Sequence, residues 1–330
     1  TSRIEKNEEY LSKDNTNTIK GIFLFFVFIS HFIGYKVYLQ DSYIDTIGVT
    51  IIKKMGQLMV TLFLFYSGYG IMESAKKKGT EYINNLPRKR ILTTLLHFDI
   101  AVLVFMIASR YFITHDFSLK KLVLSLIGWD GFGNSNWYIF CIIILYFIAY
   151  LSLKSFKDKK NIVISMFIGT LLYTIIMSFY KETWWYNTAF CFALGFTYSA
   201  YKEKIEEWIK GKELISFVYT LIIFIITYKI RKNMLWYHIN TLAFTLIIIL
   251  LTRRIKIKNT ILLWMGKNLF PLYIFQRLPM MILSKYQYMC KNTYIFFFTA
   301  MILTVIITFT YKGLLILIDK LKTRNVARSQ

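Results

Sequence analysis

Charged residues, cysteine and proline are all scarce in this chain of 330 residues. Only 18% of the residues are charged and 56% are hydrophobic, whereas soluble domains usually carry about 25% charged residues. A soluble protein of this size could not bury so much apolar surface, because a large part of any globule stays in contact with water. The composition therefore excludes a soluble enzyme, a secreted module and a disordered regulator. With only 3 prolines, long uninterrupted helices can form.

Disulfide and metal patterns are also missing from the sequence. Of the three cysteines, Cys141 and Cys191 lie inside apolar blocks and only Cys290 does not, so no disulfide framework is implied. The chain has no His-x-x-x-His pair, no Cys-x-x-Cys pair and no acidic ligand cluster. It also has no glycine-rich phosphate loop. We therefore expect a protein without a metal centre.

The chain consists mainly of ten apolar blocks. Most have the roughly 20 residues that a helix needs to cross the hydrocarbon core of a bilayer, and helices satisfy their own backbone polar groups in lipid. We expect an all-α integral membrane protein, a single bundle of about ten transmembrane helices. The sixth block is short and could be tilted, re-entrant or packed inside the bundle. The blocks are 19–39, 54–74, 91–113, 137–154, 161–180, 186–201, 213–230, 235–252, 262–283 and 293–318.

Acidic residues are few, 18 against 41 basic residues, which gives a formal net charge of +23. The N-terminal segment and every second connection carry 25 basic residues, whereas the alternate connections carry 11. This asymmetry indicates membrane orientation rather than nucleic-acid binding, with both termini in the cytoplasm and the bundle in the plasma membrane. We expect a cytoplasmic segment over 1–18, a membrane domain over 19–318 and a cytoplasmic tail over 319–330.

Polar residues inside the apolar blocks are candidate functional groups, because they are costly in lipid. His31 lies eleven residues after Lys20, where the first block enters from the cytoplasm. At 1.5 Å per residue, the imidazole lies roughly 16 Å along the helix, near the middle of the membrane. It could act as a base, an acid or a nucleophile. The alternative is a neutral histidine that is hydrogen-bonded to a neighbouring helix.

The third block carries Asp99, roughly 13 Å beyond Arg90 at the same helical rise and so at about the depth of His31. A carboxylate beside an imidazole fixes its tautomer and stabilises its protonated form. Asp99 could instead be a buried residue bonded to Ser, Tyr or backbone. Positive-inside anchoring explains the basic run before this block in general, but it does not require Arg88 and Arg90 to flank one residue.

Two other blocks carry small or polar residues. Ser67 and the residues after it, near the end of the second block, are small enough for close helix approach. The ninth block carries Tyr273, Gln276 and Arg277. A lipid-facing Arg277 would be the most expensive residue in the chain, so it should face a cavity, a carboxylate or an anionic ligand.

The longest external connection, about 114–136, ends in glycines and amides just before Trp137. Asn136 and Trp137 suit the binding of sugar rings by hydrogen bonds and stacking. The alternative is an aromatic belt at the membrane interface beside a flexible loop.

Together these segments resemble the acyltransferase-3 family of integral membrane acyltransferases, over nearly the whole chain. The family patterns are a basic residue and His separated by ten residues, an aromatic-rich run ending in Ser-Gly-Phe/Tyr, Arg-x-Arg before the third helix, Trp at the start of the fourth helix, and a later Gly-Lys-Asn…Tyr. Each pattern is short, and their order, spacing and membrane placement make the set specific. The matching residues are Lys20 and His31, Ser67 to Tyr69, Arg88 and Arg90, Trp137, and Gly266 to Tyr273.

Two positions depart from the family pattern. Lys20 stands where the family usually has Arg, which keeps the charge but loses the planar fork. Gln276 stands roughly where the family often has His, which excludes a titrating role there but leaves hydrogen bonding.

The resemblance implies transfer of an acyl group, usually acetyl, from cytoplasmic acyl-CoA to a hydroxyl of a cell-surface or lipid-linked glycan. Acetyl-CoA would be the donor, and no metal would take part. His31 would be the catalytic group, and Asp99, which comes from our reading of the residues and not from the family pattern, would orient it. We expect the donor to be bound by Lys20, Ser67, Tyr69, Arg88 and Arg90, and the acceptor by Asn136, Trp137, Tyr273, Gln276 and Arg277.

A transporter or flippase for a lipid-linked glycan is the alternative function, because it too needs polar residues in a membrane cavity. It would not need the Arg-x-Arg pattern, and the paired halves that transporters often show are not visible. A glycan polymerase is a third alternative, for which we would expect a larger external loop. Expected partners are a glycan or lipid-linked saccharide and membrane lipid but no nucleic acid, and homo-oligomerisation is left open.

Overall fold

Helices make up 84% of the computed structural model, which describes residues 2–4, 7–35, 43–112 and 117–328. Within this part of the chain, seven helical segments are long and apolar enough to cross a membrane, which confirms the all-α membrane class. Residues 36–39 of the first predicted block and 114–116 of the predicted external loop lie outside the described residues. The seven segments are Lys13–Tyr35, Ile47–Phe112, Trp137–Ser155, Lys159–Tyr180, Glu213–Ile230, Met234–Thr252 and Thr293–Ile318.

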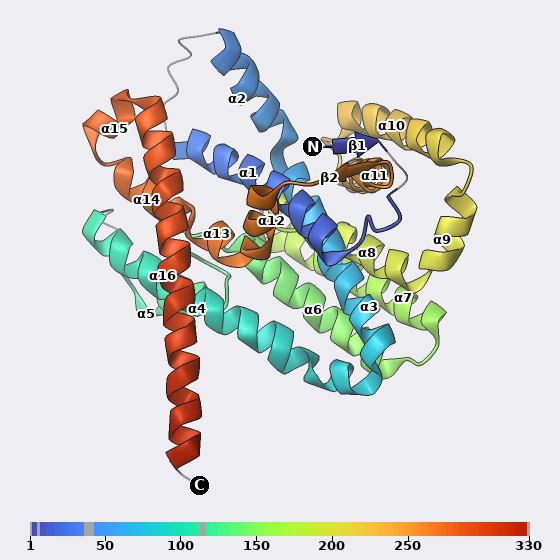
Figure 1. Ribbon diagram of the computed structural model, residues 1–330, viewed down its shortest axis with the longest axis horizontal. Coiled ribbons are helices and arrows are strands. Elements are labelled where there is room, and N and C mark those ends of the chain that lie inside the picture. The colour runs from blue at the N-terminus through green and yellow to red at the C-terminus, as the bar shows by residue number, and fades with distance from the viewer. Residues whose placement is uncertain (1, 5–6, 36–42, 113–116, 329–330) are drawn as a thin grey trace.

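Sixteen α-helices follow one another along the described chain, and all ten predicted blocks are largely helical (Figure 1). The number of membrane crossings stays a prediction, because some of these helices are short and others are joined end to end. The helices are α1 (Lys13–Tyr35), α2 (Tyr43–Met55), α3 (Thr61–Leu86), α4 (Thr93–Phe112), α5 (Leu119–Leu126), α6 (Trp137–Ser155), α7 (Lys159–Tyr180), α8 (Phe190–Ala200), α9 (Lys202–Ile209), α10 (Glu213–Ile230), α11 (Met234–Thr252), α12 (Thr260–Lys267), α13 (Leu269–Phe275), α14 (Arg277–Leu283), α15 (Gln287–Lys291) and α16 (Thr293–Arg328).

Short elements connect these helices. A 3₁₀ helix, η1 (Gly56–Val60), precedes α3, and a second, η3 (Thr183–Trp185), follows α7. A π-helical turn, η2 (Pro87–Leu92), joins α3 to α4. The only strands in the described chain, β1 (Ser2–Ile4) and β2 (Ile255–Ile257), pair antiparallel. This pairing ties the N-terminal segment to the connection after α11.

The third predicted block, 91–113, was expected to begin as a helix at the basic run that starts with Pro87. This expected start was wrong, because the helix already begins at Thr80. The chain turns sharply at Gly79, where φ is 58°, a backbone conformation that only glycine adopts at little cost. From Thr80 the helix continues through η2 into α4, and Figure 1 shows α3 and α4 meeting at the lower right. A π-helical turn tolerates Pro87, which has no N–H to donate.

Two of the predicted blocks are not single long helices. The block at 186–201 contains α8, which has 11 residues, most of them buried. Of the three alternatives for this short block, packing inside the bundle is therefore the one that the structure supports. The block at 262–283 is divided into α12, α13 and α14, with breaks at Asn268 and Gln276. By contrast, α16 continues beyond the predicted boundary at 318 as far as Arg328, and its C-terminal end projects from the rest of the molecule in Figure 1.

Glycines permit the two closest helix crossings. Where α1 crosses α12, a Cβ at Gly21 of α1 would overlap the carbonyl oxygen of Leu262, and a Cβ at Gly266 of α12 would overlap the carbonyl oxygen of Asn17. The same holds between α3 and α8, where a Cβ at Gly68 or Gly195 would meet the backbone of the facing helix. The close approach expected from the small residues after Ser67 is therefore present. These crossings fix α1 and α3, the two helices that carry Lys20, His31 and Ser67.

Alanine substitution at two neighbouring glycines of α3 tests this packing. At Gly68 the new Cβ would overlap the Phe192 carbonyl, whereas at Gly70 it would meet nothing within 4 Å. We expect Gly68→Ala to lower the free energy of unfolding by about 1–3 kcal/mol. Gly70→Ala should be neutral or stabilising by up to about 1 kcal/mol, because alanine is the better helix former. Thermal midpoints in detergent measure both, and equal midpoints would contradict the packing role.

The connections with many basic residues lie together on one face, which we call the N-terminal face, and the alternate connections lie on the opposite face. Hydrogen bonds link segments within each set. On the N-terminal face they join Asn7 to Arg253, Tyr10 to Glu206 and Asn84 to Lys154; on the opposite face they join Gln57 to Trp184, Lys181 to Trp129 and Arg231 to Lys54.

Candidate active site

A large cavity opens on the N-terminal face, between the N-terminal segment, α1 and α3. This outer cavity has a volume of about 770 Å³. Its lining includes four of the predicted donor-binding residues, Lys20, Ser67, Tyr69 and Arg90.

The charges in the outer cavity are unequally paired. Glu73 forms ion pairs with Lys76 at 3.2 Å and Lys77 at 3.4 Å, and Glu9 is ion-paired as well, with a residue of β2. Lys20 and Arg90, which lie close enough for their positive charges to interact, have no carboxylate partner among the described residues. Two cations brought together without an anion suit an anionic ligand.

A smaller inner cavity, of about 340 Å³, continues from the outer one. The two share lining residues on four elements: Ser67, Arg90, Tyr146 and Leu269. The inner cavity reaches Tyr138 and Tyr273, whose ring centroids are 5.2 Å apart. Ser67 lies within hydrogen-bonding reach of the Tyr138 and Tyr146 hydroxyls. A polar route lined by aromatic rings therefore leads from the N-terminal face into the bundle.

The imidazole of His31 lies beyond the inner end of this route, next to Tyr273, and His31 itself lines neither cavity. Its ring centroid is 6.4 Å from that of Tyr273. Its Nδ1 is buried and has no hydrogen-bond partner in the described part of the chain, and the same holds for the buried hydroxyl of Tyr66 in the wall of the outer cavity. Buried polar atoms are nearly always satisfied in native proteins, and those that lack a protein partner point to a water or a ligand. The alternative of a histidine bonded to a neighbouring helix is not what the structure shows for Nδ1.

Arg277 lies near this imidazole, at the junction of α13 and α14, whereas Gln276 lines a separate apolar pocket with residues of α1, α12 and α16. Arg277 is close enough to His31 to interact electrostatically; its Nε donates a hydrogen bond of 3.1 Å to the Tyr35 hydroxyl, and its guanidinium lies over the Tyr35 ring. No carboxylate among the described residues forms an ion pair with Arg277. Gln276 is 1% exposed and donates to the Tyr273 carbonyl.

The Asp99 carboxylate does not reach His31. Asp99 is half-buried on α4, and its Oδ1 makes no hydrogen bond with any described residue. Two residues earlier on α4, the His97 ring packs against the rings of Phe270 and Tyr311 and lines the inner cavity. The helical rise predicts a similar depth for Asp99 and His31, but the structure does not form the predicted pair.

The two arginines of the Arg-x-Arg pattern differ in position. Both lie in the π-helical turn η2, a kind of turn that is frequent at functional sites. Arg90 lines both cavities, whereas Arg88 lines neither. Arg88 contributes its carbonyl to a hydrogen bond from Thr93.

On the opposite face, the loop before α6 folds towards the site. Asn136 donates hydrogen bonds to the carbonyls of Gly128 and Asp130, so its amide nitrogen holds the loop together. The neighbouring Ser135 is buried and approaches the Tyr273 hydroxyl. Trp137 is half-buried, with its ring edge-on to Tyr138. The loop therefore covers the inner end of the route from the opposite face.

Some of the residues that line the two cavities were not predicted from the sequence. Tyr138, Ile142 and Tyr146 are four residues apart on α6 and share one face of it, as do Tyr66, Tyr69 and Glu73 on α3. Their spacing of three or four residues along a helix could have identified them from the sequence.

A basic cavity that enters a bundle of apolar helices and ends beside a half-buried imidazole defines the class: a membrane protein with an internal polar site. A family model described as "Acyltransferase domain" matches residues 14–312. The chain therefore belongs to the acyltransferase-3 family and is a membrane acyltransferase. No curated protein and no solved structure shows significant similarity to it.

Proposed function

We propose that this acyltransferase moves an acetyl group from cytoplasmic acetyl-CoA to a hydroxyl of a cell-surface or lipid-linked glycan. The observation that carries the proposal is the route from Lys20 and Arg90, through the inner cavity, to Tyr273, whose ring centroid is 6.4 Å from that of His31. Such a route suits a donor with a polyanionic head and an extended arm that ends in a thioester.

The donor would bind from the N-terminal face. Lys20 and Arg90 supply unpaired positive charge for its phosphates, and the arginine fork matches phosphate oxygens. The pantetheine arm would follow Ser67, Tyr138 and Tyr146 into the inner cavity. Because CoA is a cytoplasmic molecule, the proposal requires the N-terminal face to lie in the cytoplasm, which is also what the basic residues concentrated there predict.

His31 would carry the chemistry in one of two ways. As a general base, the imidazole would accept the proton of the acceptor hydroxyl while the hydroxyl oxygen attacks the thioester carbonyl; the C–S bond breaks and the leaving thiolate takes the proton back. In a relay, the imidazole would attack the thioester, CoA would leave as the thiol, and the acceptor oxygen would then take the acetyl group from nitrogen. Both routes balance with acetyl-CoA and an alcohol alone.

The acceptor would approach from the opposite face. Tyr273 and Arg277 lie next to His31, Gln276 donates a hydrogen bond to the Tyr273 carbonyl, and Asn136 and Trp137 belong to the loop on the opposite face. Since the Asn136 amide nitrogen is used inside the loop, Trp137 and Arg277 are better placed than Asn136 to contact a sugar.

Asp99 as an orienting group for His31 remains part of the proposal only if a water bridges the two or α4 shifts when the donor binds. Without such a bridge, the free Oδ1 of Asp99 has no route to the imidazole. This makes Asp99 separable from His31 by mutation.

Incubation of the purified protein with acetyl-labelled acetyl-CoA tests the proposed function. We expect binding together with slow hydrolysis of the thioester, or label on His31 if the relay operates. The same protein with Lys20→Ala and Arg90→Ala should neither bind nor hydrolyse the donor, because the unpaired positive charge is removed. A wild-type protein that neither binds nor hydrolyses acetyl-CoA, but moves a lipid-linked glycan across the membrane of vesicles, would instead support the flippase alternative.

A further inference from the structure

The N-terminal strap, residues 7–12, is fastened across the N-terminal face. Its first residue, Asn7, donates from its backbone N–H to the Arg253 carbonyl at 2.8 Å and from its side chain to the Thr252 carbonyl at 2.9 Å. Residues 2–4 before it pair with β2. The strap is thus held to the end of α11, far from it in sequence.

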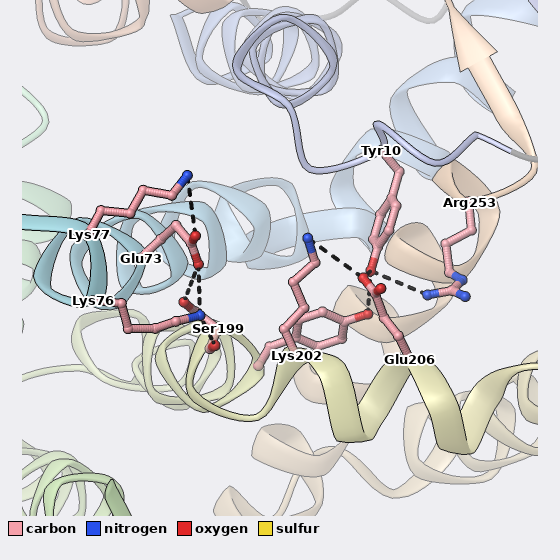
Figure 2. A network of polar contacts seen from close by, with 9 residues as sticks. Tyr10, Glu73, Lys76, Lys77, Ser199, Lys202, Glu206 and Arg253 are labelled. Atoms are coloured by element: carbon pink, nitrogen blue, oxygen red, sulfur yellow. Dashed lines mark hydrogen bonds and ion pairs between the residues drawn. The ribbon is translucent and has the colours of Figure 1, made fainter.

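Tyr10 makes the central attachment of the strap. Its side chain is 3% exposed, and its hydroxyl lies 2.6 Å from the Tyr198 hydroxyl and donates to Glu206 at 2.8 Å. The guanidinium of Arg253 donates to the same hydroxyl at 3.3 Å and lies over the Tyr10 ring. Figure 2 shows Tyr10, Glu206 and Arg253 converging on this point.

Burial, with Tyr198 and Glu206 adding to it, raises the pKa of the Tyr10 hydroxyl above its ordinary value. The hydroxyl therefore keeps its proton at every physiological pH, and it donates to Glu206 throughout that range.

The strap is also a wall of the outer cavity. Glu8, Glu9, Leu11 and Ser12 line this cavity together with the residues proposed to bind the donor. Lys202, another lining residue, lies 3.8 Å from the carboxylate oxygen of Glu206 that accepts from Tyr10. A single carboxylate therefore connects the fastening of the strap to a cation in the cavity wall.

A second network in the wall of the outer cavity pairs the negative charge of Glu73 with two lysines. The Glu73 carboxylate is held by Lys76 and Lys77 and accepts a hydrogen bond from Ser199 at 3.0 Å, as Figure 2 shows to the left of the first network. Ser199, which binds Glu73, and Tyr198, which binds Tyr10, are neighbours on α8, so both networks are attached to this helix. Two parts of the cavity wall, Glu73 on α3 and the strap, are thus attached to α8.

We propose that Tyr10 is a positioning residue for the acyl donor: by fastening the strap to α8 and α9 it completes the wall of the outer cavity and sets the affinity for CoA. This inference rests on the proposed function, since it takes CoA as the ligand of the cavity. Tyr10 is remote from His31, so it acts on donor binding and not on the transfer step.

The test compares Tyr10→Phe and Glu206→Gln with Tyr228→Phe. Tyr228 is a matched control on the opposite face: its hydroxyl donates to the Lys54 carbonyl and accepts from Arg231, whose guanidinium lies over its ring. We expect Tyr10→Phe to raise the Kd for CoA and the KM for acetyl-CoA by about 5- to 30-fold, which is the effect of removing the hydroxyl from a buried charged network. The kcat should stay within about twofold, and Tyr228→Phe should change none of these constants.

Hydrogen exchange supplies a second readout. CoA should slow amide exchange in residues 7–12 of the wild type, because a ligand and the closed strap stabilise one another reciprocally. Unchanged Kd, KM and exchange in both variants, with a wild type that binds CoA, would overturn the role of Tyr10 and leave the proposed function intact. A wild type that fails to bind CoA would overturn both. If Tyr10→Phe does not fold, Glu206→Gln decides alone.

Discussion

His31→Ala is expected to abolish acetyl transfer while the protein still folds. A general acid–base side chain contributes roughly 10²–10⁴-fold to a rate, so transfer should fall by at least about 100-fold. Folding should survive, because Nδ1 of His31 has no partner in the described chain that its removal would leave unsatisfied. Transfer of labelled acetyl from acetyl-CoA to a glycan in vesicles, with the thermal midpoint in detergent, measures both quantities.

The matched control is His238→Ala. His238 is a buried histidine, 6% exposed, whose ring packs on α11 against the Phe190 ring and not against Tyr273. It should lose stability without losing the transfer activity of the folded fraction. Full transfer by His31→Ala, or loss of transfer in both variants at equal stability, would contradict the assignment of His31 as the catalytic group.

Arg90→Ala should weaken CoA binding far more than Arg88→Ala, although both belong to one short pattern. Arg90 lines both cavities and faces Lys20 there, whereas Arg88 lines neither. The loss of one or two hydrogen bonds to a charged group, each about 1.5–3 kcal/mol, corresponds to roughly a 10- to 100-fold increase in Kd. Arg88→Ala should change Kd by less than about threefold. Titration calorimetry with CoA in detergent measures both.

A charge-keeping variant separates recognition from topology. Arg90→Lys leaves the basic residue that anchors the helix but removes the planar fork, so the protein should insert normally and still bind CoA more weakly than the wild type. Equal losses from Arg88→Ala and Arg90→Ala, with intact insertion, would show that the two arginines act together and that the difference in their positions has no effect on binding.

Depth along a helix could be predicted from the sequence, because it depends only on the rise per residue. Lys20 lines the outer cavity, and His31 lies beyond the inner end of the route, in the order that their spacing indicated. Rotation about the helix axis could not be predicted in the same way. Asp99 shows this limit: its predicted depth was suitable, but the residues that decide where its carboxylate points lie on other helices.

Contacts between distant segments were out of reach for the same reason. The attachment of Tyr10 to Tyr198 and Glu206 joins positions nearly two hundred residues apart, and no local pattern marks it. The tyrosines of α6 were different, since Tyr138 and Tyr146 share a helix face whatever the fold. Patterns within one helix were therefore open to prediction from sequence, and pairings between helices were not.

The π-helical turn at Pro87–Leu92 has a consequence for how this site tolerates change. A π-helical turn contains one residue more than the α-helical turn that it replaces. Deleting a single residue there would restore regular α-helical geometry and remove the bulge, so the residues inside the turn would shift around the helix axis relative to the helices on either side. Arg90 would swing out of the cavities, while the composition, charge and hydropathy of the span stayed nearly the same. A mutational survey by substitution alone would never reveal this dependence, which is a matter of residue count and not of residue identity.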